Sequence, residues 1–387
     1  MNLSSKVFLR KKFKEYYFRN RIPSPPEVAR REFGVGTLED KIKFRHKSFQ
    51  SARELEAYLR AEAPFYISYS SAYYEFPANT PMESKNWLGA DLVFDLDVPM
   101  SFADERKMEE VKGEALNLLD FLTNDFAFPR ARIEVNFSGS KGYHIHVYDE
   151  SVRKLSGDAR REIVDYVTGT GLDIDYFMED TPVPGDRTVD SPSKGKRDVL
   201  HKGPSGAEGG WGGKIYQGVC DFFRNATVDD FQSLPGVGEK KASELMEFAS
   251  EHMRDLERRE WSLLKKFGDK TWRKILANII EAKAVKMAGD TDKMVTIDTS
   301  RPMRLPGTLH GGTGFSAAIV KDLDSFNPLS DAVVFGSGMV DVTLSADVPK
   351  IKLKGESLGP FKTGEKTPLP EYAAVYLILK GAAEMSK

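Results

Sequence analysis

The sequence predicts an α/β (α+β) protein with mixed sheets, and three observations lead to this class. Residues 89–98, GADLVFDLDV, alternate side chains with the period of two that is typical of a strand. Residues 132–149, RIEVNFSGSKGYHIHVYD, have the pattern of a strand, a glycine-containing turn and a second strand. Residues 105–124 and 153–169 carry apolar residues at helical spacing, so helices alternate with strands along the chain.

Composition sets the broad class. The chain has 387 residues, of which 40% are hydrophobic, enough for one large core or two to three modest ones. No run approaches the roughly 18 to 20 apolar residues of a membrane helix, and the N-terminus lacks the apolar segment of a signal peptide. We therefore expect a cytoplasmic protein with no membrane partner.

The cysteine content and the net charge limit which metal ions and which macromolecules the chain is expected to bind. Cys220 is the only cysteine, so the chain can form neither an internal disulfide nor a thiolate zinc cluster. The net charge of −2 argues against a basic surface wrapped in nucleic acid. Residues 1–60 nevertheless contain 15 Lys and Arg against 7 Asp and Glu, an excess that suits either a phosphate-attracting patch or a solvated helical face.

The remaining elements follow in chain order. Helical patterns occupy 3–20 and 51–62, strand-like runs occupy 41–49 and 65–77, and a Gly-, Pro- and Ser-rich loop spans 180–214. Helices follow over 227–288, then a strand at 294–298, short β-like runs, and a helix near 371–384. The order predicts a discontinuous α/β core (1–220 and 290–387) with a helical lobe or insertion at 221–289.

Inside the predicted lobe, residues 234–248 read LPGVGEKKASELMEF. A Pro-Gly-Val-Gly turn before a basic, amphipathic helix resembles the helix-hairpin-helix element that offers backbone N–H groups to a DNA phosphate. A short turn between two packed helices explains the same pattern. Both interpretations stay open.

Two carboxylates share one face of the first strand, because Asp95 and Asp97 are two residues apart. Side by side they repel each other unless a cation lies between them, and a hard divalent cation prefers such oxygen ligands. A solvent-facing pair is the alternative. Asp298, at the end of a predicted strand, offers a third carboxylate for two-metal phosphoryl or nucleotidyl transfer.

Basic and glycine-rich turns complement these carboxylates. Lys141 and His144 lie in the predicted hairpin, and Arg304 and His310 lie in the loop after Asp298. Such groups suit phosphates whose negative charge grows toward the leaving group. The alternatives are two satisfied histidines or a separate metal site at His144 and His146, and surface ion pairs for the arginines.

Three segments in this order, ADLVFDLD, SGSKGYHIHV and IDTSRPMRLPGTLHGGTG, resemble motifs I, II and III of the small catalytic subunit of archaeal and eukaryotic DNA primase. REF at 31–33 and FRHKSF at 44–49 are also similar to that family. The resemblance covers most of residues 30–315. It implies the primase small-subunit catalytic fold, with mixed sheets around the active site and a helical insertion.

The resemblance also implies a function: a primosome enzyme of DNA replication that makes short primers on single-stranded DNA from NTPs and extends them with dNTPs. The implied partners are a primase large subunit and the template strand, and the implied cofactor is Mg²⁺ or Mn²⁺. Zinc is not expected, because the stretch where many relatives carry a Cys/His knuckle, 98–137, contains neither residue.

By position, the resemblance assigns the catalytic metal ligands to Asp95, Asp97 and Asp298. It assigns the triphosphate contacts to Ser138, Lys141, His144, Arg304 and His310. Glu32 and Arg45 match family positions near the same site. In the family the turn after Ser-Gly usually carries two basic residues, whereas here Ser140 occupies one position and only Lys141 remains.

Two other function classes stay open at this point. A metal-dependent nuclease or phosphodiesterase uses the same carboxylates but has less need of phosphate-binding turns. A non-catalytic nucleic-acid-binding module needs no metal at all. Labelled triphosphates and a template distinguish the three, because only a primase makes products longer than the nucleotide.

Overall fold

The computed structural model describes residues 1–177, 179–182, 199–234, 236–261, 268–287 and 290–386. The chain forms two compact units. The first contains residues 1–116, 128–164 and 286–387, and the second contains 117–127 and 165–285. The predicted helical lobe, 221–289, therefore falls almost wholly within the second unit.

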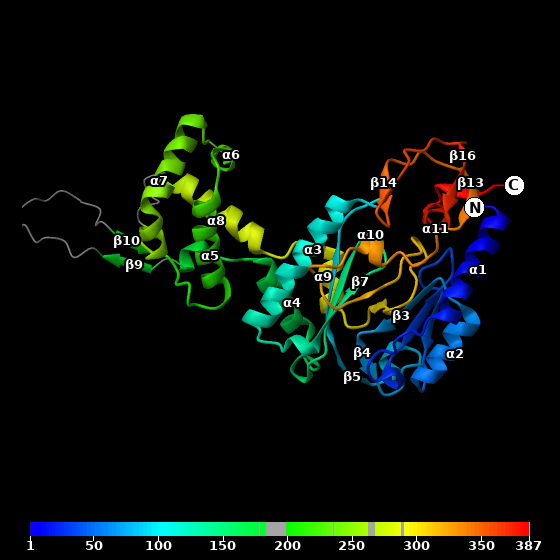
Figure 1. The fold of residues 1–387 in the computed structure, drawn as a ribbon. Coiled ribbons are helices and arrows are strands. Elements are labelled where there is room, and N and C mark those ends of the chain that lie inside the picture. The colour runs from blue at the N-terminus through cyan, green and yellow to red at the C-terminus, as the bar shows by residue number, and fades with distance from the viewer. Residues whose placement is uncertain (178, 183–198, 235, 262–267, 288–289, 387) are drawn as a thin grey trace, which may run out of the picture. The chain divides into compact units, whose positions relative to one another are not determined.

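Two four-stranded antiparallel sheets form the centre of the first unit (Figure 1). The first sheet has the strand order β11-β3-β1-β2, with bounds Pro302–Arg304, Tyr66–Ser70, Phe33–Gly36 and Phe44–Lys47. The second has the order β12-β7-β8-β6, with bounds Ile319–Val320, Ile133–Phe137, Gly142–Val147 and Leu92–Asp97. The period-two segments of the sequence are thus adjacent strands, β6 and β7 flanking β8.

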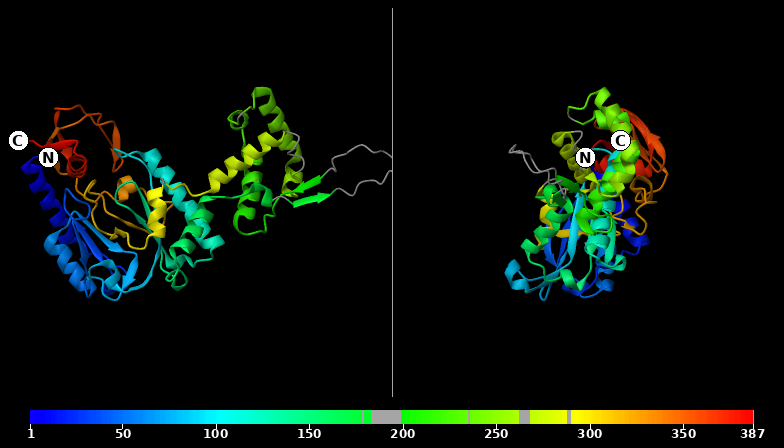
Figure 2. Two further views of the ribbon diagram at one scale, coloured as in Figure 1. Left: turned by 180° about the vertical axis from the view of Figure 1, so that it is seen from behind. Right: turned by 90° about the vertical axis from the view of Figure 1, so that its left-hand side faces the viewer.

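Helices cover these sheets. Helix α1 (Leu3–Arg19) begins at an Asn2 cap and α2 (Ala52–Glu62) at a Ser51 cap, and the two lie side by side next to the first sheet (Figure 2). Helix α2 buries Leu55 and Leu59, as its amphipathic pattern predicts, whereas α1 buries Leu9, Phe13 and Tyr17 but leaves Val7 and Phe18 exposed. The boundary between the two units runs through α3 (Glu105–Asp120) and α4 (Gly157–Thr168).

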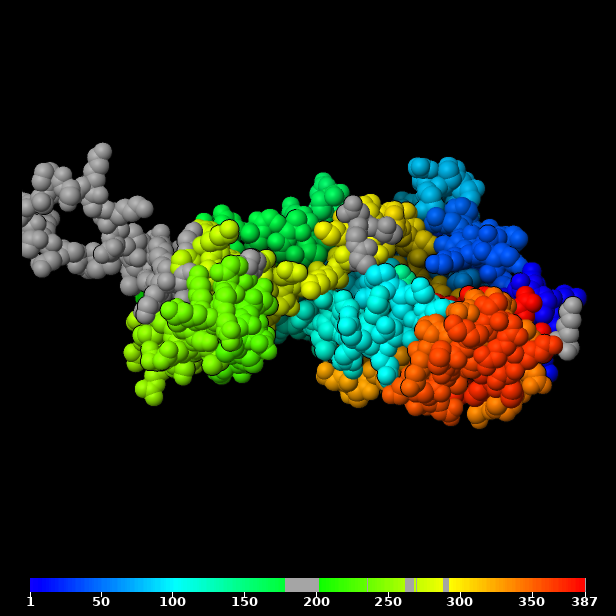
Figure 3. All heavy atoms as spheres, turned by 90° about the horizontal axis from the view of Figure 1, so that it is seen from above, coloured from blue at the N-terminus to red at the C-terminus, as the bar shows by residue number. Residues whose placement is uncertain are grey.

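The C-terminal segments complete the first unit with small sheets and helices. They comprise α10 (Pro328–Asp331), α11 (Glu371–Leu379), the sheet β16-β13-β17 (Lys366–Pro370, Met339–Leu344, Ala383–Met385) and the hairpin β14-β15 (Ile351–Leu353, Glu356–Leu358). Figure 3 shows these orange and red segments against the start of α3 in cyan. There the Ala103 N–H donates to the Tyr376 hydroxyl at 2.7 Å, which joins the last helix to the chain after β6. A separate hairpin pairs β4 (Ala72–Tyr74) with β5 (Trp87–Ala90).

The described part of the second unit is mainly helical. Its helices are α5 (Gly210–Asn225), α6 (Val228–Gln232), α7 (Glu239–Glu257) and α8 (Asp269–Lys283). The predicted loop at 180–214 contains strands β9 (Glu179–Pro182) and β10 (Val199–Lys202), while 183–198 lie outside the described residues. Helices α6 and α7 flank the turn of the helix-hairpin-helix-like segment. No described helix is both long and apolar enough to cross a bilayer.

One element differs from its prediction. Residues 294–298 were expected to form a strand, but they end a helix, α9 (Asp290–Ile297), that packs on β6. Val295, Thr296 and Ile297 have strand propensity, which tertiary packing overrides here. A helix changes which side chains of this segment share a face, and this decides which carboxylate reaches the site.

A buried ion pair joins the first sheet to β6. Arg31 and Asp91 are almost fully buried, 2.7 Å apart, and Arg31 also donates to the carbonyl oxygens of Ser70 and Ser71. We expect Asp91→Asn to cost roughly 3–5 kcal/mol in the free energy of unfolding, because the guanidinium stays buried without its counter-charge. Urea denaturation measures this cost. The matched control is Asp347→Asn at the exposed Asp347–Lys362 pair, which should leave the midpoint almost unchanged, and equal effects would contradict the prediction.

Candidate active site

A cavity of about 500 Å³ opens in the first unit between its two central sheets. Its lining combines carboxylates with cationic and imidazole side chains, a mixture suited to an anion held with a cation. The charged and imidazole side chains of the lining include Lys41, Asp95, Asp97, Lys141, His144, Arg304 and His310. Ser138, Ser140, Arg301 and Val295 complete the polar rim and one wall.

The carboxylate pair lies at the end of β6. In the ladder with β8, Asp95 is opposite His144 and Asp97 is opposite Gly142. A Cβ at position 142 would overlap the backbone of Leu96, so the close approach at this point requires glycine. The side-by-side arrangement inferred from the DxD spacing is thus present at the cavity.

Electrostatics at this pair favour a bound cation. Burial raises the pKa of Asp95 well above its usual value, and the carboxylates of Asp97 and Asp292 raise it further. The Oδ1 atom of Asp95 is buried and has no hydrogen-bond partner among the described residues. Such an arrangement is costly unless a positive charge reaches the oxygen.

The third carboxylate near Asp95 comes from α9. Asp292 is buried, its charge acts on Asp95, and α9 packs directly on β6. Asp298 is also described and does not line the cavity. Its Oδ1 accepts hydrogen bonds from the backbone N–H and the hydroxyl of Ser300, at 3.0 and 2.7 Å. Neither carboxylate lines the cavity, but the charge of Asp292 raises the pKa of Asp95, which favours Asp292 over the predicted Asp298 as the third carboxylate near the pair.

His144 and Lys141 face the two carboxylates from the β7–β8 hairpin. The Nε2 atom of His144 lies 3.4 Å from Asp95 Oδ1, and Lys141 Nζ lies 3.1 Å from Asp97 Oδ2. Burial lowers the pKa of His144 to about 4, so its imidazole is neutral at pH 7. The contact between His144 and Asp95 is consequently not an ion pair. Lys141 supplies the positive charge next to the two carboxylates.

The turn between β7 and β8 is held by Ser138. Its hydroxyl oxygen accepts from the backbone N–H of Gly142 at 3.2 Å and of Ser140 at 3.4 Å. Gly139 has a φ of +81°, and its carbonyl oxygen accepts from the Thr313 hydroxyl. Ser138, predicted as a phosphate contact, therefore shapes the turn, and Gly139 ties the turn to the loop that carries His310.

Arg304 and His310 line the same cavity from β11 and from the loop that follows it. Arg304, on β11, lies with its guanidinium 5.1 Å from the Tyr66 ring, and its Nη1 is buried without a hydrogen-bond partner in the described residues. Burial lowers its pKa, and the carboxylates of Asp95 and Asp97 act in the opposite direction. His310 Nδ1 accepts the Gly312 N–H at 3.1 Å, so in the neutral ring Nε2 carries the proton. Both side chains offer N–H donors to an anion.

Glu32 and Arg45 lie beside the cavity rather than in its lining. Glu32 is buried, accepts from Arg45 Nε at 2.9 Å, and lies 3.6 Å from Lys85 Nζ. Arg45 also donates to the Ser300 carbonyl oxygen at 3.2 Å. These two residues tie β2 to the loop before Arg304, so the geometry gives them a positioning role.

The sequence did not point to Lys41 and Ser68, which line the cavity, or to Asp292, which is not part of its lining. Lys41 and Ser68 were not singled out because one cation and one serine carry no motif. Asp292 had a usable signal, because it precedes Val295 by three residues and both share a face once the segment is read as a helix. Within the described residues, no three His, Cys, Asp or Glu side chains lie close enough to form a ready metal cluster.

Comparisons with known proteins agree with this geometry. A family model described as DNA primase small subunit matches residues 94–322, which contain every cavity residue from β6 to His310. The protein described as "DNA primase small subunit PriS" from Methanothrix thermoacetophila is 38% identical, with 100% of both chains covered. Those from Archaeoglobus fulgidus (98% of both chains covered) and Haloarcula marismortui (100% of both) are 35% and 33% identical.

The chain belongs to the DNA primase small-subunit family. It is accordingly a template-dependent nucleotidyltransferase, as its three motifs predict, and its mixed helices and antiparallel sheets agree with the predicted fold. The first unit of this primase subunit holds the cavity with the carboxylates of motif I, the hairpin of motif II and the Arg304–His310 loop of motif III.

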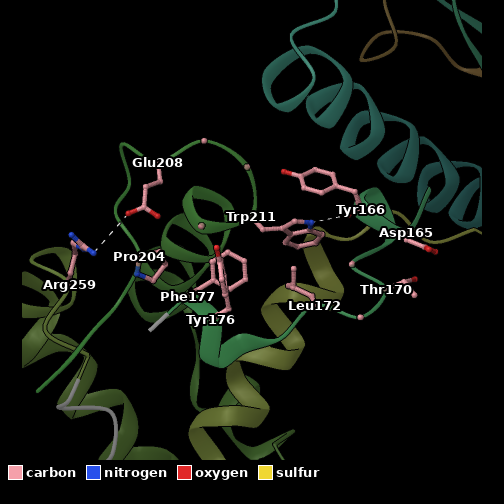
Figure 4. A pocket seen from close by; sticks show the side chains of 15 residues that line it. Asp165, Tyr166, Thr170, Leu172, Tyr176, Phe177, Pro204, Glu208, Trp211 and Arg259 are labelled. Atoms are coloured by element: carbon pink, nitrogen blue, oxygen red, sulfur yellow. Dashed lines mark hydrogen bonds and ion pairs between the residues drawn. The ribbon is translucent and has the colours of Figure 1, made fainter. Parts of the chain in front are cut away.

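The second unit of this primase subunit has a cavity of its own, of about 590 Å³ (Figure 4). Tyr166, Tyr176, Phe177 and Trp211 give it an aromatic lining, and the Trp211 indole donates to the Tyr166 carbonyl oxygen at 2.8 Å. Its described ionisable groups are two carboxylates and one guanidinium. This lining offers one cationic side chain, whereas Lys41, Lys141, Arg301 and Arg304 line the first unit's cavity.

Proposed function

We propose that this chain makes primers on single-stranded DNA by divalent-metal-dependent nucleotidyl transfer, with the incoming triphosphate in the first unit's cavity. One observation carries the proposal. The carboxylates of Asp95 and Asp97, on β6, line the same cavity as the N–H donors of Arg304, on β11, and of His310, in the loop after β11. A triphosphate with its cation supplies partners to both sets, including Asp95 Oδ1 and Arg304 Nη1, which are buried without a hydrogen-bond partner among the described residues.

The donor set fits a hard divalent cation such as Mg²⁺ or Mn²⁺, because the buried oxygens are carboxylates. Asp95, Asp97 and Asp292 would hold it, with Asp292 in place of Asp298. When bound, such an ion neutralises the triphosphate and lowers the pKa of the attacking 3′ hydroxyl. Zinc is not part of the proposal, since a single cysteine, Cys220, cannot build a thiolate site.

The side chains have distinct tasks in this mechanism. Arg304 and the Nε2–H of His310 bind triphosphate oxygens, and charge-assisted hydrogen bonds strengthen as negative charge moves to the pyrophosphate. Lys141 exchanges its contact with Asp97 for a phosphate oxygen, which frees Asp97 to bind metal. His144 stays neutral beside Asp95 Oδ1, so it adds no positive charge next to that carboxylate.

The proposed partners are a primase large subunit, the template strand, and NTPs or dNTPs. A priming assay with labelled NTPs or dNTPs on a single-stranded template, run with and without a candidate large subunit, tests the function. Products longer than the nucleotide, lost on chelation of divalent metal, support it. A shortened template indicates a nuclease, and activity limited to metal-independent DNA binding indicates a binding module.

Arg304→Ala should weaken nucleotide binding without weakening the fold. The guanidinium lacks a hydrogen-bond partner for Nη1 among the described residues, so its removal relieves burial of a charge. We expect the KM for the nucleotide to rise about tenfold or more, because a hydrogen bond to a charged group contributes roughly 1.5–3 kcal/mol. Steady-state primer extension measures this change.

Two further variants test the interpretation of Arg304. Arg304→Lys keeps the charge but loses the forked contact, so its KM should lie between those of the wild type and the Ala variant. Arg161→Ala removes an exposed arginine of α4, outside the cavity, and should have no effect. An unchanged KM in Arg304→Ala would place the triphosphate elsewhere.

A further inference from the structure

The hairpin of β1 and β2 exposes large apolar side chains among lysines. Residues 41–44, here named the hairpin strip, are all exposed: Lys41, Ile42, Lys43 and Phe44. Ile42 retains 41% and Phe44 52% of its surface accessible, whereas Phe33 and Phe49 on either side of the strip are buried. Burial of the neighbouring aromatic residues stabilises the fold, so the exposure of Phe44 calls for another explanation.

The strip is continuous with the active-site cavity. Lys41 and Ile42 line the cavity, and Phe44 follows them along the edge strand of the first sheet. The charge of Lys41 acts on both Asp95 and His310, which places its ammonium within reach of both sides of the site. A strand that enters the cavity past Lys41 therefore runs over Lys43 and Phe44.

The charged side chains of the hairpin strip and of strand β2 are all positive. Positions 41, 43, 45 and 47 are Lys, Lys, Arg and Lys, and the sequence contains no carboxylate from 41 to 53. Buried Glu32 engages Arg45, while Lys41 and Lys43 lie exposed beside the aromatic ring. Basic side chains interleaved with an exposed aromatic ring suit single-stranded nucleic acid, with the cations on phosphates and a base stacked on the ring.

Another exposed aromatic cluster lacks these features. Phe76 (50% exposed) and Trp87 (40%) lie on the β4–β5 hairpin and its loop, and neither lines the cavity. The Lys154 ammonium lies 5.3 Å from the centre of the Trp87 ring and the Lys43 ammonium 5.9 Å from that of Phe44, so a lysine contact does not distinguish the two rings. Position at the cavity and charge together therefore single out the hairpin strip, and Phe76 provides a matched control.

We propose that the hairpin strip binds the single-stranded template next to the active site, with Phe44 stacked on a base and Lys41 and Lys43 on the backbone. This proposal rests on the proposed function, because it names the path of the template strand that the enzyme would copy at the cavity. A strand held here lies next to the incoming nucleotide, because Lys41 and Ile42 line the cavity. The strip binds template whatever its sequence, because every base has a stacking face.

The test measures binding without catalysis. A 5′-fluorescein-labelled oligo-dT is titrated with the full-length chain in EDTA, and its anisotropy gives the dissociation constant. We expect Phe44→Ala to weaken binding about fivefold or more, the effect of losing one stacked base. Phe76→Ala, equally exposed, should bind like the wild type. Lys43→Gln should reduce the slope of log affinity against log salt by about one.

Three outcomes overturn the proposal: no binding of the oligonucleotide by the wild type, equal affinity for Phe44→Ala and wild type, or loss only of association with a large subunit. Because Phe44 is exposed, its variant folds, and a thermal melt confirms this. Asp95→Asn should bind the oligonucleotide normally. If the wild type makes no primers but Phe44→Ala still weakens oligonucleotide binding, the proposed function is refuted. The hairpin strip is then still supported as a binding surface.

Discussion

Asp95→Asn is expected to reduce primer synthesis by more than about a hundredfold and to leave the metal-free fold as stable as the wild type or more so. Changes around metal ligands already cost about 10–100-fold, so loss of a ligand itself costs more. The gain in stability follows from the site: Asp95 is buried beside the carboxylates of Asp97 and Asp292, which raise its pKa. Asparagine keeps the shape and removes the repulsion.

The sign of the pH dependence follows from that raised pKa. A carboxyl group with a raised pKa in the folded state stabilises the fold below its unfolded pKa of about 4, and this contribution is lost as the pH rises through the folded value. Asp95→Asn should therefore melt above the wild type at pH 7.5 in EDTA, and the difference should shrink near pH 4. Thermal melts at both pH values measure this.

Metal addition separates a ligand from a structural residue. Mg²⁺ or Mn²⁺ should raise the Tm of the wild type, because a ligand that binds only the native state stabilises it, and should raise that of Asp95→Asn much less. Asp341→Asn, an exposed carboxylate on β13, is the control and should behave as the wild type in every assay. A fully active Asp95→Asn enzyme would remove the carboxylate pair from the mechanism.

The local patterns of the catalytic sheet could be predicted from the sequence. The period of two in residues 92–97 and 142–147 forms β6 and β8, and their pairing brings Asp95 opposite His144. Turn chemistry at 138–142 is also local, since Ser138 closes its own turn. These features depend on neighbours in sequence, which a single sequence displays.

What could not be predicted depends on packing between distant segments. Nothing local tells that residues 290–297 form a helix on β6, because Val295 to Ile297 favour a strand and the surrounding sheet decides. Exposure is a tertiary property too. Phe44 belongs to an alternating run that predicts a half-buried strand, yet β2 is the edge of its sheet and leaves the ring uncovered.

The second prediction with a large expected effect on primer synthesis distinguishes Asp292 from Asp298 as the third metal-binding carboxylate. We expect Asp292→Asn to lose primer synthesis by about a hundredfold or more, and Asp298→Asn to retain most of it. Asp292 is buried on α9 and its charge reaches Asp95. The Asp298 carboxylate accepts two hydrogen bonds from Ser300 and lies 3.6 Å from Arg301 Nε, which occupies both of its oxygens.

Three measurements on this matched pair separate direct ligation from loop positioning. Asp298→Asn weakens the contacts of the loop before Arg304, so it should raise the KM for the nucleotide and leave the metal-induced rise in Tm intact. Asp292→Asn should abolish much of that rise, and its metal-free Tm should equal or exceed the wild type because repulsion with Asp95 is relieved. The opposite pattern would return Asp298 to the metal site. In that case α9 would serve only as the wall that carries Val295, and the carboxylate acting on Asp95 from α9 would be a source of strain without a catalytic task.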